Sequence, residues 1–503
     1  MANKQSNENK EKKTNTEHAN KEENTSVKPN YKDNVDWLRS ELGVSKSFDM
    51  LHLDLFYAGR DMSLFTIDGM TKDKITHFLM ELLAGLEEED LANHPLERLV
   101  RTYLPYIEVS TETSLDKVAF WVLSGASALV VDGLDKVIII DARTYPVRGP
   151  KEPDVERVVR GPRDGFVETI VFNTALIRRR VRDPSLRMEY MSVARRSKTD
   201  ICVCYIEDIV NPNIVETIKK NVSQIDTDGL PMGEKTIEEF IGGRHFNPYP
   251  TVRYTERPDT AAVHLYEGRV IVIVDGTPVA LIAPSTYWNQ LQHAEEFRHK
   301  PITGCYLRMI RYLCVWASIF MLPIWYLLAS HPGFAGGAAF IEIDKQLDMP
   351  LVGQILLIEF GIDALRMATV HTPSAMGSAL GLVSAIVIGQ IAIQAGLFAK
   401  EVILYMSVAA IGTFATPMYE VSLANRLARV GLILLAVLFG LPGFIAGVLV
   451  FTIYLTSLKS FYMPYLWPFI PFDPSAMKDV LFRIPKPLNN RRPKALYPKD
   501  PDK

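Results

Sequence analysis

The feature that most constrains this chain is a change in composition near residue 300. Earlier residues mix charged, polar and apolar side chains, whereas residues 312–458 are mostly apolar. Two runs in that stretch, 312–329 and 375–399, carry no charge. They approach or exceed the roughly 20 residues that a membrane-spanning helix needs. The sequence therefore predicts an α-helical multi-pass membrane domain, with spans over residues 309–329, 351–369, 374–396, 402–418 and 428–458.

The region before the apolar stretch predicts an α+β fold in two subdomains. Residues 127–143 contain two β-rich runs around Asp132-Gly133, and residues 261–284 repeat this scheme around Asp275-Gly276. The matching strings LVVDG and VIVDG fit either an internal duplication or two unrelated hairpins with the same turn. Because one short match is weak evidence for a repeat, the second interpretation is favoured.

Four prolines between residues 143 and 166 predict a linker between the two subdomains. The first residues of the chain are rich in Lys, Glu, Asn and Thr, a composition typical of disorder. The predicted parts are a disordered tail, two cytosolic α+β subdomains, a transmembrane helical domain and a basic C-terminal tail, over residues 1–33, 34–150, 151–300, 301–463 and 464–503.

Charge and the absence of a leader predict the topology. The first 30 residues have no apolar core, so the first span is expected to act as the insertion signal and to leave the N-terminal region in the cytosol. The positive-inside rule places Arg308, Arg311, Arg426, Arg429 and the basic tail on the same side. Five plain crossings would put the tail outside. An even number follows if one segment is re-entrant or if the last run is split at Gly440-Leu441-Pro442-Gly443.

The composition excludes several classes of function. A net charge of -3 gives no indication of nucleic-acid binding. Four cysteines suggest a reducing compartment and no disulfide framework. Cys202 and Cys204 alternate with apolar residues and are read as packing residues rather than ligands. No metal cluster, nucleotide loop or nucleophile motif is present, so we expect no enzyme activity, cofactor or metal.

A charged stripe interrupts the second predicted span. Glu359, Asp363 and Arg366 are spaced i, i+4 and i+7, which places them on one face of a helix. Each charge at the middle of a membrane costs roughly 2.5–3.5 kcal/mol on insertion scales. Arg366 can offset Asp363 within the helix, and one negative charge then remains. That charge is expected to need water, a neighbouring subunit or an ion.

Two interpretations of the stripe remain open. It can be structural, as an interfacial helix or a salt bridge inside a bundle. It can instead belong to a ring of acids that lines a cation path between several subunits. On the second interpretation the candidates for the ion path are Glu359, Asp363, Arg366 and Gln390.

Several long strings resemble the GerA-type spore germination A subunits. They are GPRDGFVETIVFNTALIRRRV, TDICVCYIEDI, EGRVIVIVDGTPVALIAP, RYLCVWASIFMLP and PGFIAGVLVFTIYLTSLKSFYMPYLWPF, at residues 161–181, 199–209, 267–284, 311–323 and 442–469. The resemblance implies a protein of the spore inner membrane with a large cytosolic N-terminal region. It further implies a homo-oligomer around an ion-conducting pore, in contact with lipid and with other germination proteins of that membrane.

One motif departs from the receptor pattern of this family. Nutrient-receptor A subunits carry a string like R-E-A-G-x-R-x-P after the membrane acids, whereas this chain has RMATVHTP at residues 366–373. With YTERPD (254–259) and QHAEEFR (292–298), this resembles the branch of stage V sporulation protein AF. The expected function is an oligomeric ion channel or ion-release component of germination. The alternatives are a nutrient-receptor A subunit and a non-conducting membrane scaffold.

Overall fold

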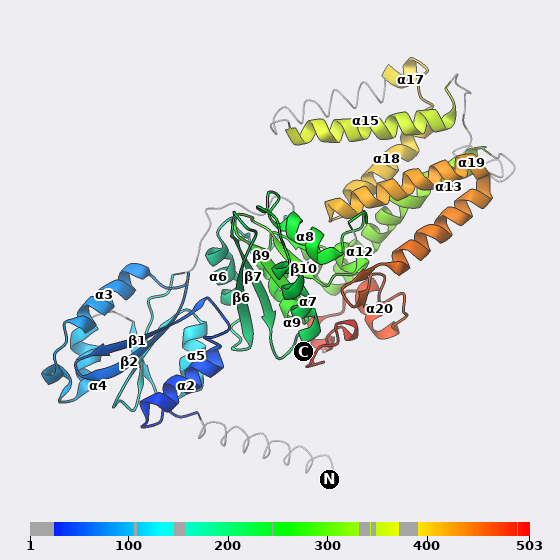
Figure 1. The fold of residues 1–503 in the computed structure, drawn as a ribbon. Coiled ribbons are helices and arrows are strands. Elements are labelled where there is room, and N and C mark those ends of the chain that lie inside the picture. The colour runs from blue at the N-terminus through cyan, green and yellow to red at the C-terminus, as the bar shows by residue number, and fades with distance from the viewer. Residues whose placement is uncertain are drawn as a thin grey trace, which may run out of the picture. The chain divides into compact units, whose positions relative to one another are not determined.

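A computed structural model gives the fold of this chain and describes residues 25–104, 108–144, 156–243, 245–330, 343, 349–371, 391–489 and 491–502. These residues form two compact units (Figure 1). The sheet unit comprises the described residues up to 243, together with 254–284 and 491–502. The helical unit comprises 245–253 and the described residues from 285 to 489.

The sheet unit contains two five-stranded antiparallel sheets with helices, in agreement with the predicted mixture of helices and strands in the N-terminal region. The first sheet has the strand order β1-β2-β4-β5-β3 and the second has the order β6-β7-β9-β10-β8. The strands are β1 (Met50–Tyr57), β2 (Arg60–Ile67), β3 (Val109–Glu112), β4 (Ser127–Val131), β5 (Val137–Ile140), β6 (Leu186–Val193), β7 (Thr199–Ile206), β8 (Arg253–Thr255), β9 (Val270–Val274) and β10 (Ala280–Ala283).

The two sheets have the same strand order. In each, two eight-residue strands pair along their whole length, as β1 with β2 and β6 with β7. The hairpin β4–β5 of the first sheet corresponds to the hairpin β9–β10 of the second. The turn of the first contains Gly133 (φ 76°) and the turn of the second contains Gly276 (φ 83°). Both glycines have the left-handed backbone that a side chain disfavours. LVVDG and VIVDG thus occupy equivalent positions in two sheets of the same strand order, an arrangement that fits an internal duplication.

Helices cover both faces of the first sheet. On one face, α2 (Tyr31–Leu42) and α5 (Leu115–Leu123) share an apolar core with alternate residues of the central strands. On the other face, α3 (Asp73–Ala84), η1 (Glu88–Leu91), α4 (Pro95–Arg98) and η2 (Leu99–Tyr103) pack against the intervening residues. Because both faces are covered, β4 is buried along its whole length.

The second sheet has equivalent helices. Its helices are α6 (Ile170–Arg180), α7 (Pro212–Ser223), α8 (Glu234–Gly242) and α9 (Pro258–Tyr266). The core under α6 and α9 contains Cys202 and Cys204, whose thiols lie 3.5 Å apart and are fully buried. Burial raises the pKa of the Cys202 thiol, which keeps this thiol protonated.

A buried ion pair joins the two repeats. The guanidinium of Arg178 on α6 donates from Nε and Nη2 to the two carboxylate oxygens of Asp49, at 3.0 and 3.1 Å. Both side chains are almost inaccessible to solvent, at 0% and 1% exposure. The backbone N–H of Phe48 also donates to the carbonyl of Met188. The two-pronged geometry is the strongest that an arginine and a carboxylate can form.

The helical unit contains long apolar helices. Its elements are α10 (Tyr287–Gln290), α11 (Ala294–Arg298), α12 (Pro301–Trp316), η3 (Ala317–Met321), α13 (Leu322–Ser330), α15 (Leu351–His371), α17 (Ala392–Gln394), α18 (Lys400–Phe414), α19 (Tyr419–Ser457), β11 (Lys459–Ser460), β12 (Met463–Pro464) and α20 (Pro474–Leu481). Two described helices, Pro301–Ser330 and Tyr419–Ser457, are long and apolar enough to cross a membrane. Most of the predicted span over 374–396 lies outside the described residues.

The last apolar run is a helical hairpin. Gly440 has φ 62° and ψ -146°, which breaks α19 into two halves. Gly443 and Gly447, on the second half, contact Leu435 and Leu432 of the first half so closely that a Cβ atom would collide. This small-residue spacing lets helix backbones approach each other. The last run is therefore split at Gly440 into a pair of helices folded back on itself (Figure 1).

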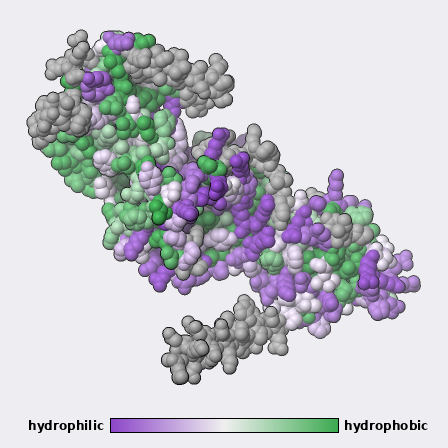
Figure 2. All heavy atoms as spheres, turned by 180° about the vertical axis from the view of Figure 1, so that it is seen from behind, coloured by the Kyte–Doolittle hydropathy of each residue, from purple (hydrophilic) through white to green (hydrophobic). Residues whose placement is uncertain are grey.

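The surface of the helical unit is apolar. Large hydrophobic side chains are exposed along α12 and both halves of α19, as Figure 2 shows in green. Examples are Ile302, Leu313, Leu427, Leu438, Phe439, Leu449, Val450 and Ile453. A continuous surface of this kind marks contact with lipid or with other proteins.

Candidate functional site: a buried ion-pair cluster

The charged stripe lies on α15 and contacts the first half of α19. The carboxylate of Glu359 is buried, with 6% of the residue exposed. Its Oε1 atom accepts a hydrogen bond of 2.5 Å from Nη2 of Arg429 and lies 3.3 Å from Nε of Arg426. The same Arg426 forms an ion pair with Asp363. We call Glu359, Asp363, Arg426 and Arg429 the ion-pair cluster.

Two further elements hold Arg429 in place. Its Nη1 atom donates to the carbonyl oxygen of Ser318 in η3 at 2.6 Å and lies 3.4 Å from Oγ1 of Thr413 in α18. Only 2% of the Arg429 side chain is exposed. The guanidinium group thus connects four helical segments, because its partners come from α15, η3 and α18 while Arg429 itself belongs to α19. Such a contact fixes the relative positions of these helices.

The structure corrects the expected charge balance of the stripe. The surplus negative charge was expected to need water, a second subunit or an ion. Instead, Arg426 and Arg429 of the same chain provide two positive charges for the two acids. Arg366 lies over the rings of Phe414 and Tyr419, at 5.1 and 4.8 Å from their centroids. Gln390, the fourth candidate, lies outside the described residues.

Sequence reasoning missed both arginines as members of the site. The positive-inside rule assigned Arg426 and Arg429 to a cytosolic loop, whereas the structure buries them within α19. Their spacing of i, i+3 matches the i, i+4 spacing of Glu359 and Asp363 on a facing helix. Buried Asn425 and Ser422 extend the same polar face of α19. This polar face of α19 was the signal in the sequence that could have identified both arginines as members of the site.

The ion-pair cluster lies about midway along the apolar helices. Ser318 follows Arg308 by ten residues on one continuous helical segment, which corresponds to about 15 Å. Arg429 precedes the hairpin tip at Gly440 by eleven residues, about 16 Å on the same scale. The two distances add up to about the 30 Å of a bilayer core. The cluster is therefore about 15 Å along the helices from Arg308 and about 16 Å from Gly440.

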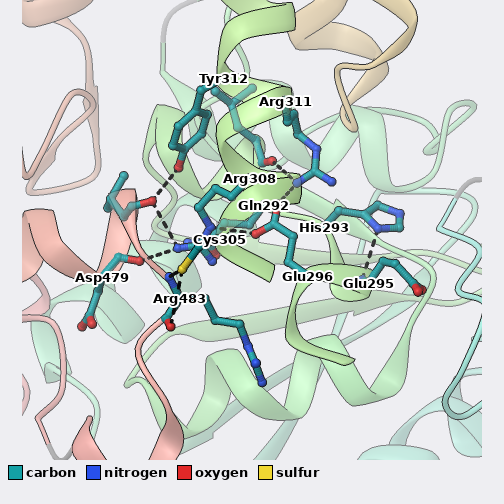
Figure 3. Close-up of polar contacts among 12 residues, drawn as sticks. Gln292, His293, Glu295, Glu296, Cys305, Arg308, Arg311, Tyr312, Asp479 and Arg483 are labelled. Carbon is teal, nitrogen blue, oxygen red and sulfur yellow. Dashed lines mark hydrogen bonds and ion pairs between the residues drawn. The ribbon is translucent and has the colours of Figure 1, made fainter. Parts of the chain in front are cut away.

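A second charged group is found at the start of α12 (Figure 3). Glu296 of α11 accepts a hydrogen bond of 2.8 Å from Nε of Arg308 and also pairs with Arg311. Nη1 of Arg308 donates to the carbonyl oxygens of Asp479 and Val480, at 2.6 and 3.1 Å. This group, which we call the base cluster, anchors the segment after α19 to the beginning of α12. The two short helices α10 and α11 precede α12 as separate elements.

The comparisons with known proteins agree with one another. The family model described as Bacillus/Clostridium GerA spore germination protein matches residues 36–495. Stage V sporulation protein AF of Bacillus subtilis (strain 168) is 45% identical over 481 residues, which cover 95% of this chain and 98% of that protein. Spore germination protein KA of the same organism is 31% identical over 490 residues, which cover 95% and 89%.

Among solved structures, one similar chain is the N-terminal domain of the A subunit of the Bacillus megaterium spore germinant receptor GerK3. It is 28% identical to this chain, with a TM-score of 0.41, and the match covers 52% of this chain and 98% of that one.

This chain belongs to the GerA family of spore germination proteins. Its identity is higher to the stage V sporulation protein AF than to germination protein KA. The resemblance to that branch, inferred from residues 366–373, is therefore confirmed.

Proposed function

We propose that this protein is an integral membrane component of bacterial spore germination, in which an oligomer conducts ions across the spore inner membrane. In this proposal the apolar helices cross the membrane, and the sheet unit and the C-terminal tail lie in the cytosol. The ion-pair cluster acts as the gate, because cations reach Glu359 and Asp363 only when the two arginines release them. Related copies and other germination proteins of the membrane are the expected partners.

The C-terminal residues support an even number of crossings. Lys499 donates from its backbone N–H to the carbonyl of Ile209 at 2.9 Å and from Nζ to the carbonyl of Glu207 at 3.0 Å. Nε of Arg492 donates to the carbonyl of Tyr266 at 2.9 Å. The chain thus leaves the sheet unit after residue 284 and rejoins it at residue 491. Since a folded unit lies on one side of a membrane, the crossings between those points must be even in number.

The hairpin at Gly440 supports the same topology. Five spans were counted from the sequence, with the last run as one of them. Its two halves, 419–439 and 441–457, are about 31 and 25 Å long at 1.5 Å per residue. Both lengths approach the thickness of the hydrocarbon core. Counting the halves separately raises the number of crossings from five to six.

The observation that carries the proposal is the position of the ion-pair cluster. Glu359 and both arginines are buried at about half the length of apolar helices, where charge is expensive, and the side chain of Asp363 is 37% exposed. Replacing a buried ion pair by apolar side chains is often neutral or stabilising, so stability alone does not account for these residues. Charged residues inside a membrane commonly belong to ion or proton pathways.

Potassium flux from liposomes tests the proposal. The purified protein would be reconstituted as the wild type, as Glu359→Gln/Asp363→Asn and as the control Glu401→Gln. Glu401 is a buried acid at the start of α18 outside the ion-pair cluster. We expect flux in the wild type and in the control. In the double variant the flux should differ from the wild-type value by at least about tenfold, which corresponds to a free-energy difference of about 1.4 kcal/mol. The oligomer mass must be the same in all three.

Absence of wild-type flux would contradict conduction by this protein alone. Flux that is equal in the wild type and the double variant would move the ion path away from α15.

A membrane scaffold is the second candidate function, and one observation favours it. The acids of α15 already have their charge partners inside the same chain, so they can act as a structural connection between helices. In that case the double variant would support germination as well as the wild type in spores that contain equal amounts of protein.

A further inference from the structure

Residues 245–253 belong to the helical unit although both of their neighbours in sequence belong to the sheet unit. The segment follows α8 (Glu234–Gly242) and leads directly into the edge strand β8 (Arg253–Thr255). It nevertheless belongs to the same compact unit as the described residues from 285 to 489. We call residues 245–253 the connecting segment, because it is joined covalently at both ends to one unit and held noncovalently by the other.

The helical unit binds the backbone of the connecting segment through several hydrogen bonds. Nε2 of Gln290 donates to the carbonyl of Val252 at 2.7 Å, and Oγ of Ser460 donates to the carbonyl of Thr251 at 2.5 Å. The buried guanidinium of Arg253 donates to the carbonyls of Asn289 and Gln292, at 2.8 and 3.2 Å. The bonds to Val252 and Thr251 are buried and those of Arg253 are partly buried, so together they hold the segment in the helical unit.

The connecting segment contacts both halves of the α19 hairpin. The hydroxyl of Tyr249 donates to Oδ1 of Asn425 on the first half at 3.0 Å. The Tyr249 ring lies 6.1 Å from Phe451 and 6.5 Å from Tyr454 on the second half, centroid to centroid. Tyr454 in turn donates its hydroxyl to Oδ1 of Asn247 at 2.6 Å. Only 2% of Tyr249 is exposed, and burial raises the pKa of its phenol well above the usual value, which keeps it a donor.

The residue that Tyr249 binds is the direct neighbour of the ion-pair cluster. Asn425 precedes Arg426, which pairs with Glu359 and Asp363, and Arg429 follows one turn later. Asn425 is 1% exposed, so a displacement of its side chain requires a displacement of the helix. A shift or rotation of the first half of α19 changes the distance of both arginines from their acids, because a helix moves as a rigid element.

From these contacts we infer that Tyr249 and Asn425 are positioning residues that couple the connecting segment to the ion-pair cluster. The hydrogen bond between them holds the first half of α19 where Arg426 and Arg429 reach the two acids. A ligand or partner that displaces β8 or α8 pulls on this bond through the chain and loosens the cluster. The inference deepens the proposed function, because it gives the sheet unit a route to the gate.

A double-variant cycle tests the coupling without depending on conduction. Full-length protein in detergent would be melted as the wild type, Tyr249→Phe, Asp363→Asn and the combination of both. Tyr312→Phe is the matched control. It removes a phenol that donates to the carbonyl of Val480 at 2.8 Å in the same unit, outside the ion-pair cluster. The control would be combined with Asp363→Asn in the same way.

We expect each single variant to lower the melting temperature by a few degrees, as the loss of one buried hydrogen bond or ion pair does in a domain of this size. In the Tyr249→Phe background, Asp363→Asn should lower the melting temperature by at most about half as much as it does in the wild type. The reason is that the effects of two substitutions within one network of contacts are not additive. In the Tyr312→Phe background its effect should be unchanged. Additive shifts in the Tyr249→Phe cycle would overturn the inference.

Flux through liposomes separates this inference from the proposed function. If the wild type conducts, Tyr249→Phe should raise the flux about fivefold and Tyr312→Phe should leave it unchanged, since a lost hydrogen bond of roughly 1 kcal/mol corresponds to about fivefold in population. An unchanged flux in Tyr249→Phe would overturn the coupling. If the wild type does not conduct but the melting cycle is non-additive, the coupling stands and conduction fails.

Discussion

The two units of this protein bury charge in opposite surroundings. The sheet unit contains the bidentate pair of Arg178 and Asp49 between its two repeats, beneath a surface rich in charged residues. The helical unit contains the ion-pair cluster, in which Glu359 and both arginines are buried, and much of its surface is apolar (Figure 2). The comparison separates two uses of buried charge. One pair joins the two repeats of the sheet unit, whereas the ion-pair cluster connects helices whose outer faces are largely apolar.

The two arrangements differ in how completely the charges are satisfied. Asp49 has both carboxylate oxygens engaged by a single arginine, a closed pair with well-defined geometry. In the ion-pair cluster, Arg426 is shared between two acids, and Arg429 divides its bonds among Glu359, Ser318 and Thr413. The first is a closed joint between two residues, whereas the ion-pair cluster distributes its bonds over four helical segments.

The largest effect is expected from Asp49→Ala, which leaves Arg178 buried without its partner. The free energy of opening of α6, measured by amide hydrogen exchange on the full chain, should fall by about 3–5 kcal/mol. Asp49→Leu combined with Arg178→Met should recover most of that loss, since the charge is then removed with its partner. As a control, Asp226→Ala breaks the exposed pair with Arg195 and should have no measurable effect. A loss for Asp49→Ala as small as that of the control would mean that the joint is not a stabilising feature.

A smaller effect is expected at the tip of the helical hairpin. Gly440 has a backbone conformation (φ 62°, ψ -146°) that is essentially restricted to glycine, so Gly440→Ala should destabilise the helical unit by about 1–3 kcal/mol. Gly431→Ala is the matched control, because Gly431 lies in the same helix with no atom near its missing Cβ. The control should be neutral or stabilising, since alanine favours a helix over glycine. Equal melting temperatures in detergent for the two variants would argue for a continuous, unbroken helix.

Periodicity and turn signals were sufficient to predict much of the sheet unit. The Asp-Gly turns marked the hairpins β4–β5 and β9–β10. Strand β6 was missed because Arg187, Glu189 and Tyr190 interrupt its apolar pattern. The shared strand order of the two sheets was not predicted, because it depends on long-range pairing that the local pattern does not contain.

The candidate site was predicted only in part. The spacing of Glu359 and Asp363 identified one side of the ion-pair cluster, since a charged stripe in an apolar helix is visible in the sequence. Arg426 and Arg429 lie about 65 residues further along. Charges near the end of an apolar run are as typical of a cytosolic loop as of a buried position in a helix. Which helix faces α15 is decided by long-range packing, which the local pattern does not contain. Whether the predicted ion-path residues line a pore remains a prediction.

Charge reversal across α15 and α19 tests the central claim most directly. Asp363→Arg and Arg426→Asp each place two like charges together inside the helical unit, whereas the combined variant restores opposite charges in exchanged positions. The oligomer mass and potassium flux would be measured for all three in the same liposomes. The account predicts that either single variant loses stable assembly or flux and that the combined variant recovers at least half of both. A combined variant that is no better than the single ones would contradict the pairing of these two helices as the basis of function.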